Sequence, residues 1–195
     1  QQSLSAGWKK SIFGYLLELN LQKTLKDDFG NSLFNFQINK RYNNSVFFNA
    51  GFSYRTESPN FNFNLFRSSY TDYNWYNTDW LLQKTTAINT EIGHPKWGIL
   101  SSKLQTIDDY LFFQDITPAD QLKKILRISP TQSKNKINYF KTRFFQHFKF
   151  WKFGLINTVQ FQEILSKNSD SPDHLTSSIL NVPKWITRSS LLLET

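Results

Sequence analysis

The chain has 195 residues, a formal net charge of +8 and no cysteine, which excludes disulfide bonds, thiolate catalysis and cysteine metal sites. Charged residues make up only 19% and aromatic residues 17% of the chain, whereas soluble domains carry about 25% charged residues. No apolar run approaches the roughly 20 residues of a membrane-spanning helix, so helical spanning is excluded as well.

In chain order, the sequence predicts ten to twelve strands and no strong helix. The first segments are a short strand ending near Trp8, a turn at 9–11, strands at 12–25, 32–42 and 46–56, and a tight Asn43-Asn44 hairpin between the last two. They continue with a shorter strand at 61–66, a Tyr- and Trp-rich segment at 68–79 that fits strand or loop, and a strand at 80–92. Next come a strand at 97–113, interrupted at Asp108-Asp109, a strand at 122–128 and a polar turn at 129–135. The chain then forms a hairpin from strands at 136–148 and 153–165, a long loop at 166–182 and a last strand after Pro183. Many of these segments match the ~9–11 residues of a membrane-spanning strand and exceed the ~5–6 of a globular one.

Apolar and polar residues alternate along most of the predicted strands, and the polar member is usually Asn, Gln, Ser or Thr. The clearest examples are residues 17–22, 34–39, 48–55 and 60–65. A period of two places the two kinds of side chain on opposite faces of a strand. One apolar and one polar face on nearly every strand is typical of a closed sheet with lipid outside and water inside.

The fold class expected is therefore all-β, an antiparallel up-and-down transmembrane β-barrel. We expect residues 1–195 to form one barrel region with no separate soluble domain, and the chain to be a partial barrel from a longer protein. Polar residues of the alternating strands are expected to face the lumen: Glu18, Asn20, Gln22, Asn35, Gln37, Asn39, Asn49 and Arg55. The side of the membrane that carries the long loops stays open, because the uncertain segment near residues 68–77 changes the strand count by one.

Aromatic residues gather near predicted strand ends and turns. Tyr and Trp favour the headgroup zone of a membrane, and Lys and Arg can extend beside them. An interfacial girdle is preferred over a nucleic-acid stacking platform for this reason. The expected girdle residues are Tyr70, Tyr73, Trp75, Tyr76, Trp80, Trp97 and Trp151.

Motifs for catalysis are missing from the sequence. The histidines His94, His147 and His174 are far apart, and neither a metal-binding pattern nor a phosphate-binding loop is present. We expect no catalytic residue, no metal site and no cofactor, and we do not expect an enzyme. The excess of basic residues fits an anion-attracting lumen, a nucleic-acid surface or a drift in composition, and their scatter along the sequence favours drift.

The second half of the chain resembles a known family. The segments that carry the resemblance are residues 73–77, 95–97, 107–110, 148–153, 157–162, 180–183 and 187–190. They are similar to the putative porin family of outer-membrane proteins from Bacteroidota, over roughly residues 70 to 195. The resemblance implies a location in the outer membrane of a Gram-negative bacterium and a longer parent protein.

Three functions remain open at this point. The preferred one is a passive diffusion channel for small solutes through a polar lumen, in contact with outer-membrane lipid and not with nucleic acid. The second is a structural or accessory barrel with a plugged lumen that binds other outer-membrane proteins. The third is a soluble, basic, all-β binding protein whose apolar faces meet in a sandwich.

Overall fold

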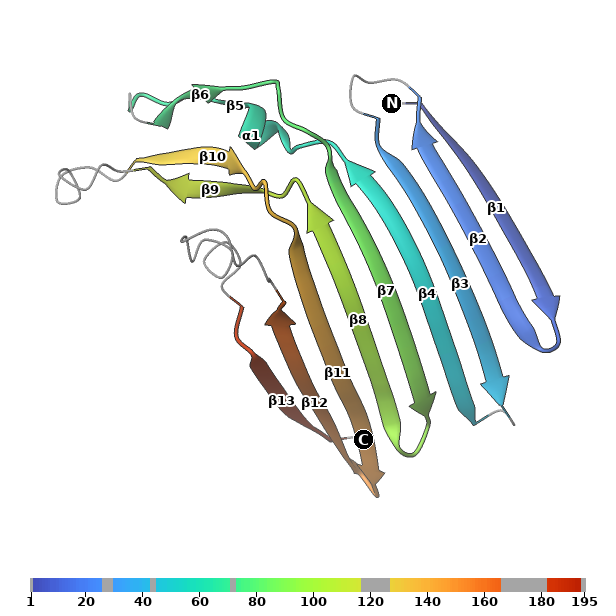
Figure 1. Cartoon of the computed structure of the whole chain (residues 1–195). Helices are drawn as coiled ribbons and strands as arrows, with labels where there is room; N and C mark the ends of the chain where they lie inside the picture. The colour runs from blue at the N-terminus through green and yellow to red at the C-terminus, as the bar shows by residue number, and fades with distance from the viewer. Residues whose placement is uncertain are drawn as a thin grey trace.

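Nine long strands form one antiparallel sheet in the computed structural model (Figure 1). The structure describes residues 2–25, 30–42, 45–70, 73–116, 127–165 and 182–193. In sheet order the nine strands are β1 (Ser3–Ile12), β2 (Tyr15–Thr24), β3 (Ser32–Tyr42), β4 (Val46–Glu57), β7 (Gln83–His94), β8 (Gly98–Asp108), β11 (Ile137–Phe150), β12 (Phe153–Ile164) and β13 (Trp185–Leu193). Sheet order follows chain order and every neighbouring pair is antiparallel, which confirms the predicted all-β, up-and-down arrangement.

The connections between neighbouring strands differ in length at the two ends of the sheet. Only two or three residues separate β1 from β2, β3 from β4, β7 from β8 and β11 from β12 in the chain, and the strand ends next to these short separations all lie at one end of the sheet, the lower end in Figure 1. The strand ends at Thr24 and Ser32, Glu57 and Gln83, Asp108 and Ile137, and Ile164 and Trp185, which are separated by longer stretches of chain, all lie at the other end. The uncertain segment at 68–79 contributes only the two-residue β6 (Trp75–Tyr76) to the described structure, so it does not disturb this alternation. We call the two ends the short-turn end and the long-loop end.

A short helix and several short strands lie at the long-loop end. They are the one-turn helix α1 (Phe61–Asn64), β5 (Leu65–Phe66) paired with β6, and β9 (Leu111–Asp115) paired with β10 (Ile128–Gln132). The prediction of a strand over 61–66 is partly wrong, because the side chain of Asn60 accepts a hydrogen bond from the Asn62 amide and caps a helical turn. The polar turn predicted at 129–135 is also wrong over most of its length. Residues up to Gln132 pair with β9, and Pro130 is tolerated in so small a sheet.

The first predicted turn is misplaced. Residues 9–11 stay in β1, and the reversal occurs at Phe13 and Gly14, whose φ angles are 50° and 74°. A Phe in the left-handed region is uncommon, so the sequence carries only a weak turn signal there. The strand predicted at 97–113 divides at Asp109, whose φ of 58° ends the strand pairing where the alternation is interrupted.

Several predicted segments fall outside the described residues. These are Asn43-Asn44, residues 122–126 of the predicted strand at 122–128, and all but Val182 of the predicted loop at 166–182. The strands that flank the Asn pair end and begin at Tyr42 and Val46, as predicted.

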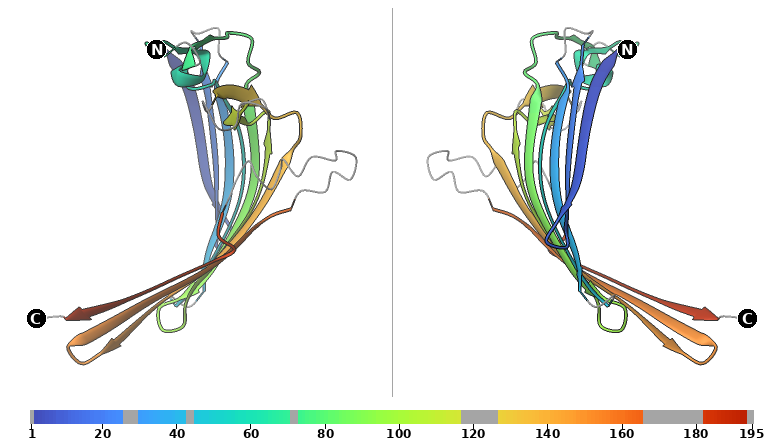
Figure 2. Two further views of the ribbon diagram at one scale, coloured as in Figure 1. Left: turned by 90° about the vertical axis from the view of Figure 1, so that its left-hand side faces the viewer. Right: turned by 90° about the vertical axis from the view of Figure 1, so that its right-hand side faces the viewer.

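The sheet is bent and twisted, and it is not closed (Figure 2). Its edge strands are β1 and β13. Because nine strands alternate in direction, β1 and β13 both run from the long-loop end to the short-turn end.

Burial is limited in this sheet. The buried apolar side chains in the described part are Ala87 on β7, Ile107 on β8, Leu111 on β9 and Ile137 on β11, and Ile107 and Ile137 are directly opposite each other. Many large apolar side chains elsewhere are exposed, among them Ile88 and Leu104. No helix in the described ranges is long and apolar enough to cross a membrane.

Candidate pore-lining face

The strand register places all eight predicted lumen residues on one face of the sheet. Residues that are directly opposite each other on neighbouring strands point to the same face. Glu18 is opposite Gln37, Asn20 is opposite Asn35, and Asn39 is opposite Asn49. Gln22 and Arg55 join the same face because both are opposite Leu33. We call this the polar face.

The polar face continues across the second half of the sheet, where the sequence analysis named no lumen residues. The register adds Asn89, Lys103, Gln105, Tyr139, Lys141, Arg143, Thr158, Gln160, Gln162 and Arg188. The signal that could have found them is the spacing of Lys103 from Gln105 and of Lys141 from Arg143, which are two residues apart like the residues in the first half. Ser and Thr residues beside these cations lie on the opposite face, so apolar and polar residues alternate less clearly in this half of the sequence.

The opposite face carries an uncharged apolar band across the middle of the sheet. One row of directly opposed residues is Leu19, Phe36, Phe52, Ile88, Leu104 and Phe140. Ile88 is 52% exposed and Leu104 is 45% exposed, although both lie in the centre of the sheet. The charged residues of this face in the described strands are Lys10, Lys23, Lys40, Lys84, Asp108 and Glu163, all within three residues of a strand end. We call this the apolar face.

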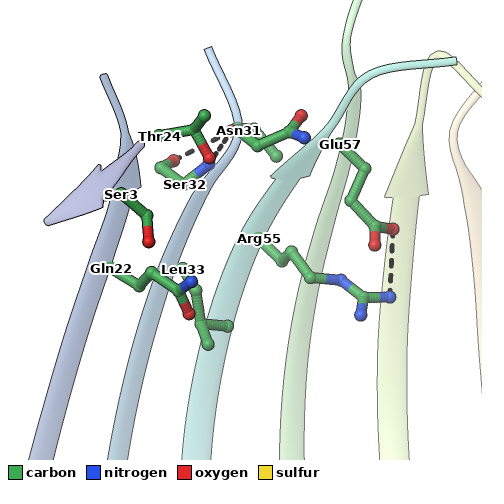
Figure 3. Close-up of a pocket in the computed structure, with 9 residues that line it drawn as sticks. Ser3, Gln22, Thr24, Asn31, Ser32, Leu33, Arg55 and Glu57 are labelled. Carbon is green, nitrogen blue, oxygen red and sulfur yellow. Dashed lines mark hydrogen bonds and ion pairs between the residues drawn. The ribbon is translucent and has the colours of Figure 1, made fainter. Parts of the chain in front are cut away.

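Charges on the polar face of β1 to β7 are matched. Lys9 pairs with Glu18 at 2.7 Å, and the Nδ2 group of Asn49 donates to Glu91 at 3.1 Å. Arg55 and Glu57 are two residues apart on β4 and their side chains meet at 3.0 Å (Figure 3). This last pair lies at a hollow near the long-loop end whose other lining residues include Ser3, Gln22 and Thr24. The lining of this half is therefore polar and close to neutral.

A hydrogen-bonded network lies on the polar face between β11 and β12. The Tyr139 hydroxyl donates to Gln162 Oε1 at 2.6 Å, and Gln160 Nε2 donates to the same oxygen at 2.9 Å. Gln162 Nε2 donates to the carbonyl oxygen of Pro183 at 2.9 Å. Because Gln162 is only 5% exposed, these bonds satisfy an amide that would otherwise be costly to bury.

Comparison with known proteins identifies a family. A family model described as "Putative porin" matches residues 1–195, the whole chain. The chain belongs to the putative porin family. No curated protein and no solved structure matches it. For this porin family member, the family description points to an outer-membrane location and agrees with the division of its sheet into a polar and an apolar face.

The predicted girdle residues of this porin lie at both ends of the sheet. Tyr70, Tyr73, Trp75, Tyr76 and Trp80 lie in the connection between β4 and β7 at the long-loop end. Trp97 and Trp151 lie in short turns at the other end and are 72% and 75% exposed. The two groups are therefore separated by the full length of the strands, as two girdles would be.

Two of the long-loop aromatic residues also hold the loop structure of the porin together. The Trp75 ring lies 4.9 Å from the ring of Phe66 and 5.6 Å from that of Phe113. The indole nitrogen of Trp75 donates to the Asn62 carbonyl at 2.9 Å, and that of Trp80 donates to the neighbouring Phe63 carbonyl at 3.1 Å. These contacts join the β4–β7 connection to β9, and we call the joined elements α1, β5, β6, β9 and β10 the cap.

Metal-binding clusters are not found in the described part of this porin: no three His, Cys, Asp or Glu side chains come together there. His94 packs its ring 4.7 Å from that of Trp97 beside the short turn between β7 and β8. His147 lies on the polar face, opposite Ile156. The third histidine, His174, lies outside the described residues.

Proposed function

We propose that this chain forms the wall of an outer-membrane β-barrel and that its polar face lines a passive diffusion channel for small solutes. The proposal assigns the protein to a Gram-negative bacterium of the Bacteroidota, as the family resemblance of residues 70 to 195 implies. The observation that carries it is the register: the polar side chains share one face of the nine-stranded sheet, and an apolar row from Leu19 on β2 to Phe140 on β11 crosses the opposite face.

The apolar band needs an apolar solvent. A sheet whose central Ile and Leu side chains remain about half exposed has no protein layer over them, and lipid is the environment that makes such exposure favourable. The nine strands have between 9 and 14 residues, which suits the ~9–11 residues that cross a bilayer at a tilt. Within the sheet, backbone groups pair with the neighbouring strands, as a lipid environment requires.

Closure of the barrel follows from strand direction. A sheet in lipid cannot leave an edge unpaired, because each unsatisfied backbone group costs several kcal/mol there. Since β1 and β13 run in the same direction, direct pairing between them would be parallel. We propose that an odd number of further strands completes an antiparallel wall and sets the width of the channel.

The orientation follows from the lengths of the connections. Outer-membrane barrels place short turns in the periplasm and long loops outside the cell. We propose that the short turns, with Trp97 and Trp151, face the periplasm and that the cap faces the exterior. Solutes would then pass the cap first and move along amide and hydroxyl side chains, with no catalytic group required.

Cysteine substitution tests the assignment of faces, because the chain contains no native Cys. The variants Asn35→Cys and Phe36→Cys lie next to each other on β3 but on opposite faces. In planar bilayers, the intact protein should form channels, and a charged, membrane-impermeant thiol reagent should change the conductance of Asn35→Cys but not that of Phe36→Cys. Absence of channels, or equal modification of both variants, would contradict the proposal.

A specific observation favours a second candidate, the plugged accessory barrel. The cap is tied to the rest of the chain by Gln132, whose side-chain amide accepts from the Leu81 amide at 3.0 Å and donates to the Leu81 and Asp109 carbonyls at 2.8 and 2.9 Å. If such a cap closes the lumen, the wild-type protein should show no channel conductance in planar bilayers, and Gln132→Ala should open the lumen and produce conductance. Channels of equal conductance in both proteins would reject the plug and its proposed role as a docking site for other outer-membrane proteins.

A further inference from the structure

The polar face carries its charges unevenly. On β1 to β7 this face has three cations, Lys9, Arg41 and Arg55, and three carboxylates, Glu18, Glu57 and Glu91. On β8 to β13 the described strands place on it the cations Lys103, Lys141, Arg143, Lys149 and Arg188, and no carboxylate. Basic residues that are scattered along the sequence are therefore concentrated on one half of one face of the folded sheet.

The central cations of this half are close neighbours. Lys103 and Lys141 are directly opposite each other on β8 and β11, a position at which like charges destabilise a sheet. Arg143 is two residues from Lys141 on the same face of β11, roughly 7 Å further along the strand. Across β12, Arg188 extends the same face on β13, opposite Thr158.

Apart from the Lys103–Lys141 pair, the side chains directly opposite these cations are neutral, and the nearest carboxylate on this face, Glu91 on β7, is opposite Ser101 and accepts a hydrogen bond from Asn49. Lys103 is flanked by Asn89, Lys141 by Gln162, and Arg143 by Ser101 and Gln160. Among the described residues, Lys103, Lys141, Arg143 and Arg188 make no ion pair, whereas Lys9 and Arg55 each have a carboxylate within 3.0 Å. A set of adjacent cations that form no ion pair, along a wall of low dielectric constant, concentrates anions beside it.

We propose that the polar face of β8 to β13 is a path for small anions, such as chloride and simple carboxylates, and that Lys103, Lys141 and Arg143 determine the selectivity. This inference rests on the proposed channel function and adds the charge class of its solutes. The neutral amides of the other half accommodate the uncharged part of a solute, while the cations lower the energy of its negative group. The repulsion between Lys103 and Lys141 is offset whenever an anion lies between them.

The size of the effect follows from Coulomb's law. A unit charge about 10 Å from the path of an ion, screened at about 0.1 M salt, changes the ratio of anion to cation permeability by about 1.7-fold. Removing three such charges should lower that ratio by about 5-fold. The change in the permeability ratio would be larger for an ion that passes closer to the wall, or in a narrower lumen.

Reversal potentials in planar bilayers test the inference with the intact protein and a gradient of potassium chloride. The wild type should prefer chloride, and the variant with Lys103→Gln, Lys141→Gln and Arg143→Gln should lose most of that preference. The control is Lys10→Gln, which removes one positive charge from the apolar face and should leave the reversal potential unchanged. A heat-dependent shift in gel mobility reports whether each variant forms a barrel, and the single variant Lys103→Gln, with about a 1.7-fold expected change, serves if the triple variant does not fold.

The outcomes separate the two proposals. If the wild type forms no channels, the channel function fails and the anion path fails with it. If channels form but prefer potassium, show no preference, or keep their chloride preference in folded Lys103→Gln, the anion path is wrong while the channel function stands. Chloride preference that falls in the triple or single variant and not in Lys10→Gln supports it.

Discussion

Ile88 offers a direct test of the apolar band. Its side chain is 52% exposed near the middle of β7, between Phe52 and Leu104 on the neighbouring strands. If this face meets lipid, Ile88→Arg places a charge near the middle of the bilayer and should cost about 2–4 kcal/mol. That penalty corresponds to a roughly 30- to 900-fold loss in the folding equilibrium. Urea titration of the intact protein in lipid vesicles, followed by heat-dependent gel mobility, measures it.

Two controls sharpen this test. Gln37→Arg introduces the same side chain on the polar face, opposite Glu18 and Gly51, and should have little effect because water and a carboxylate are available there. Ile92→Arg lies four residues nearer the short-turn end, roughly 13 Å along the strand, and should cost only about 0–1 kcal/mol. Equal penalties at residues 88 and 92 would argue for a protein-covered core, and equal penalties at 88 and 37 would refute the division into two faces.

Three further predictions concern particular contacts. Gly98→Ala should destabilise the β7–β8 hairpin by about 1–3 kcal/mol, because φ is +102° there and an added Cβ would collide with backbone; Gly30→Ala, which meets nothing within 4 Å, should be neutral in the same urea titration. Tyr139→Phe should cost about 0.5–1.5 kcal/mol in that titration through the lost hydrogen bond to Gln162, and an unchanged midpoint would contradict the network. Trp97→Phe should reduce the quenching of tryptophan fluorescence by a headgroup-labelled lipid more than the quenching by a lipid labelled at the end of its acyl chain. The reverse order would show that Trp97 does not lie in the girdle.

The sequence predicted the sheet well because the alternation of residue types is a strictly local signal. Residues 32–42 and the hairpin that begins at Ile137 were predicted to within one or two residues. Apolar and amide side chains alternate without interruption from Phe34 to Asn39, whereas β11 is a longer segment that mixes aromatic, basic and amide residues. The turn at Phe13 and Gly14 was missed because a bulky aromatic residue occupies a backbone conformation that it rarely adopts. Lys9 and Lys10 resemble turn residues in sequence, but Lys9 is stabilised in the strand by its ion pair with Glu18.

The polar face was predictable only in part. Residues such as Asn35 and Gln37 stand between large apolar neighbours, so their face is evident from the sequence alone. Lys103 and Lys141 are separated by 38 positions along the chain, and their pairing depends on the register of β8 with β11. A register across a long connection is set by the whole sheet, and no local pattern reveals which distant charges it brings together.

The uneven lengths of the connections also bear on how the molecule assembles. Each short turn joins two long strands into a hairpin whose contacts are local in sequence: β1–β2, β3–β4, β7–β8 and β11–β12. Such hairpins close in microseconds, whereas contacts across long connections form slowly. We expect the sheet to assemble from these four preformed pairs, which dock side by side while the long connections are still loose. Nucleation would then start at the short-turn end, and the cap would order last.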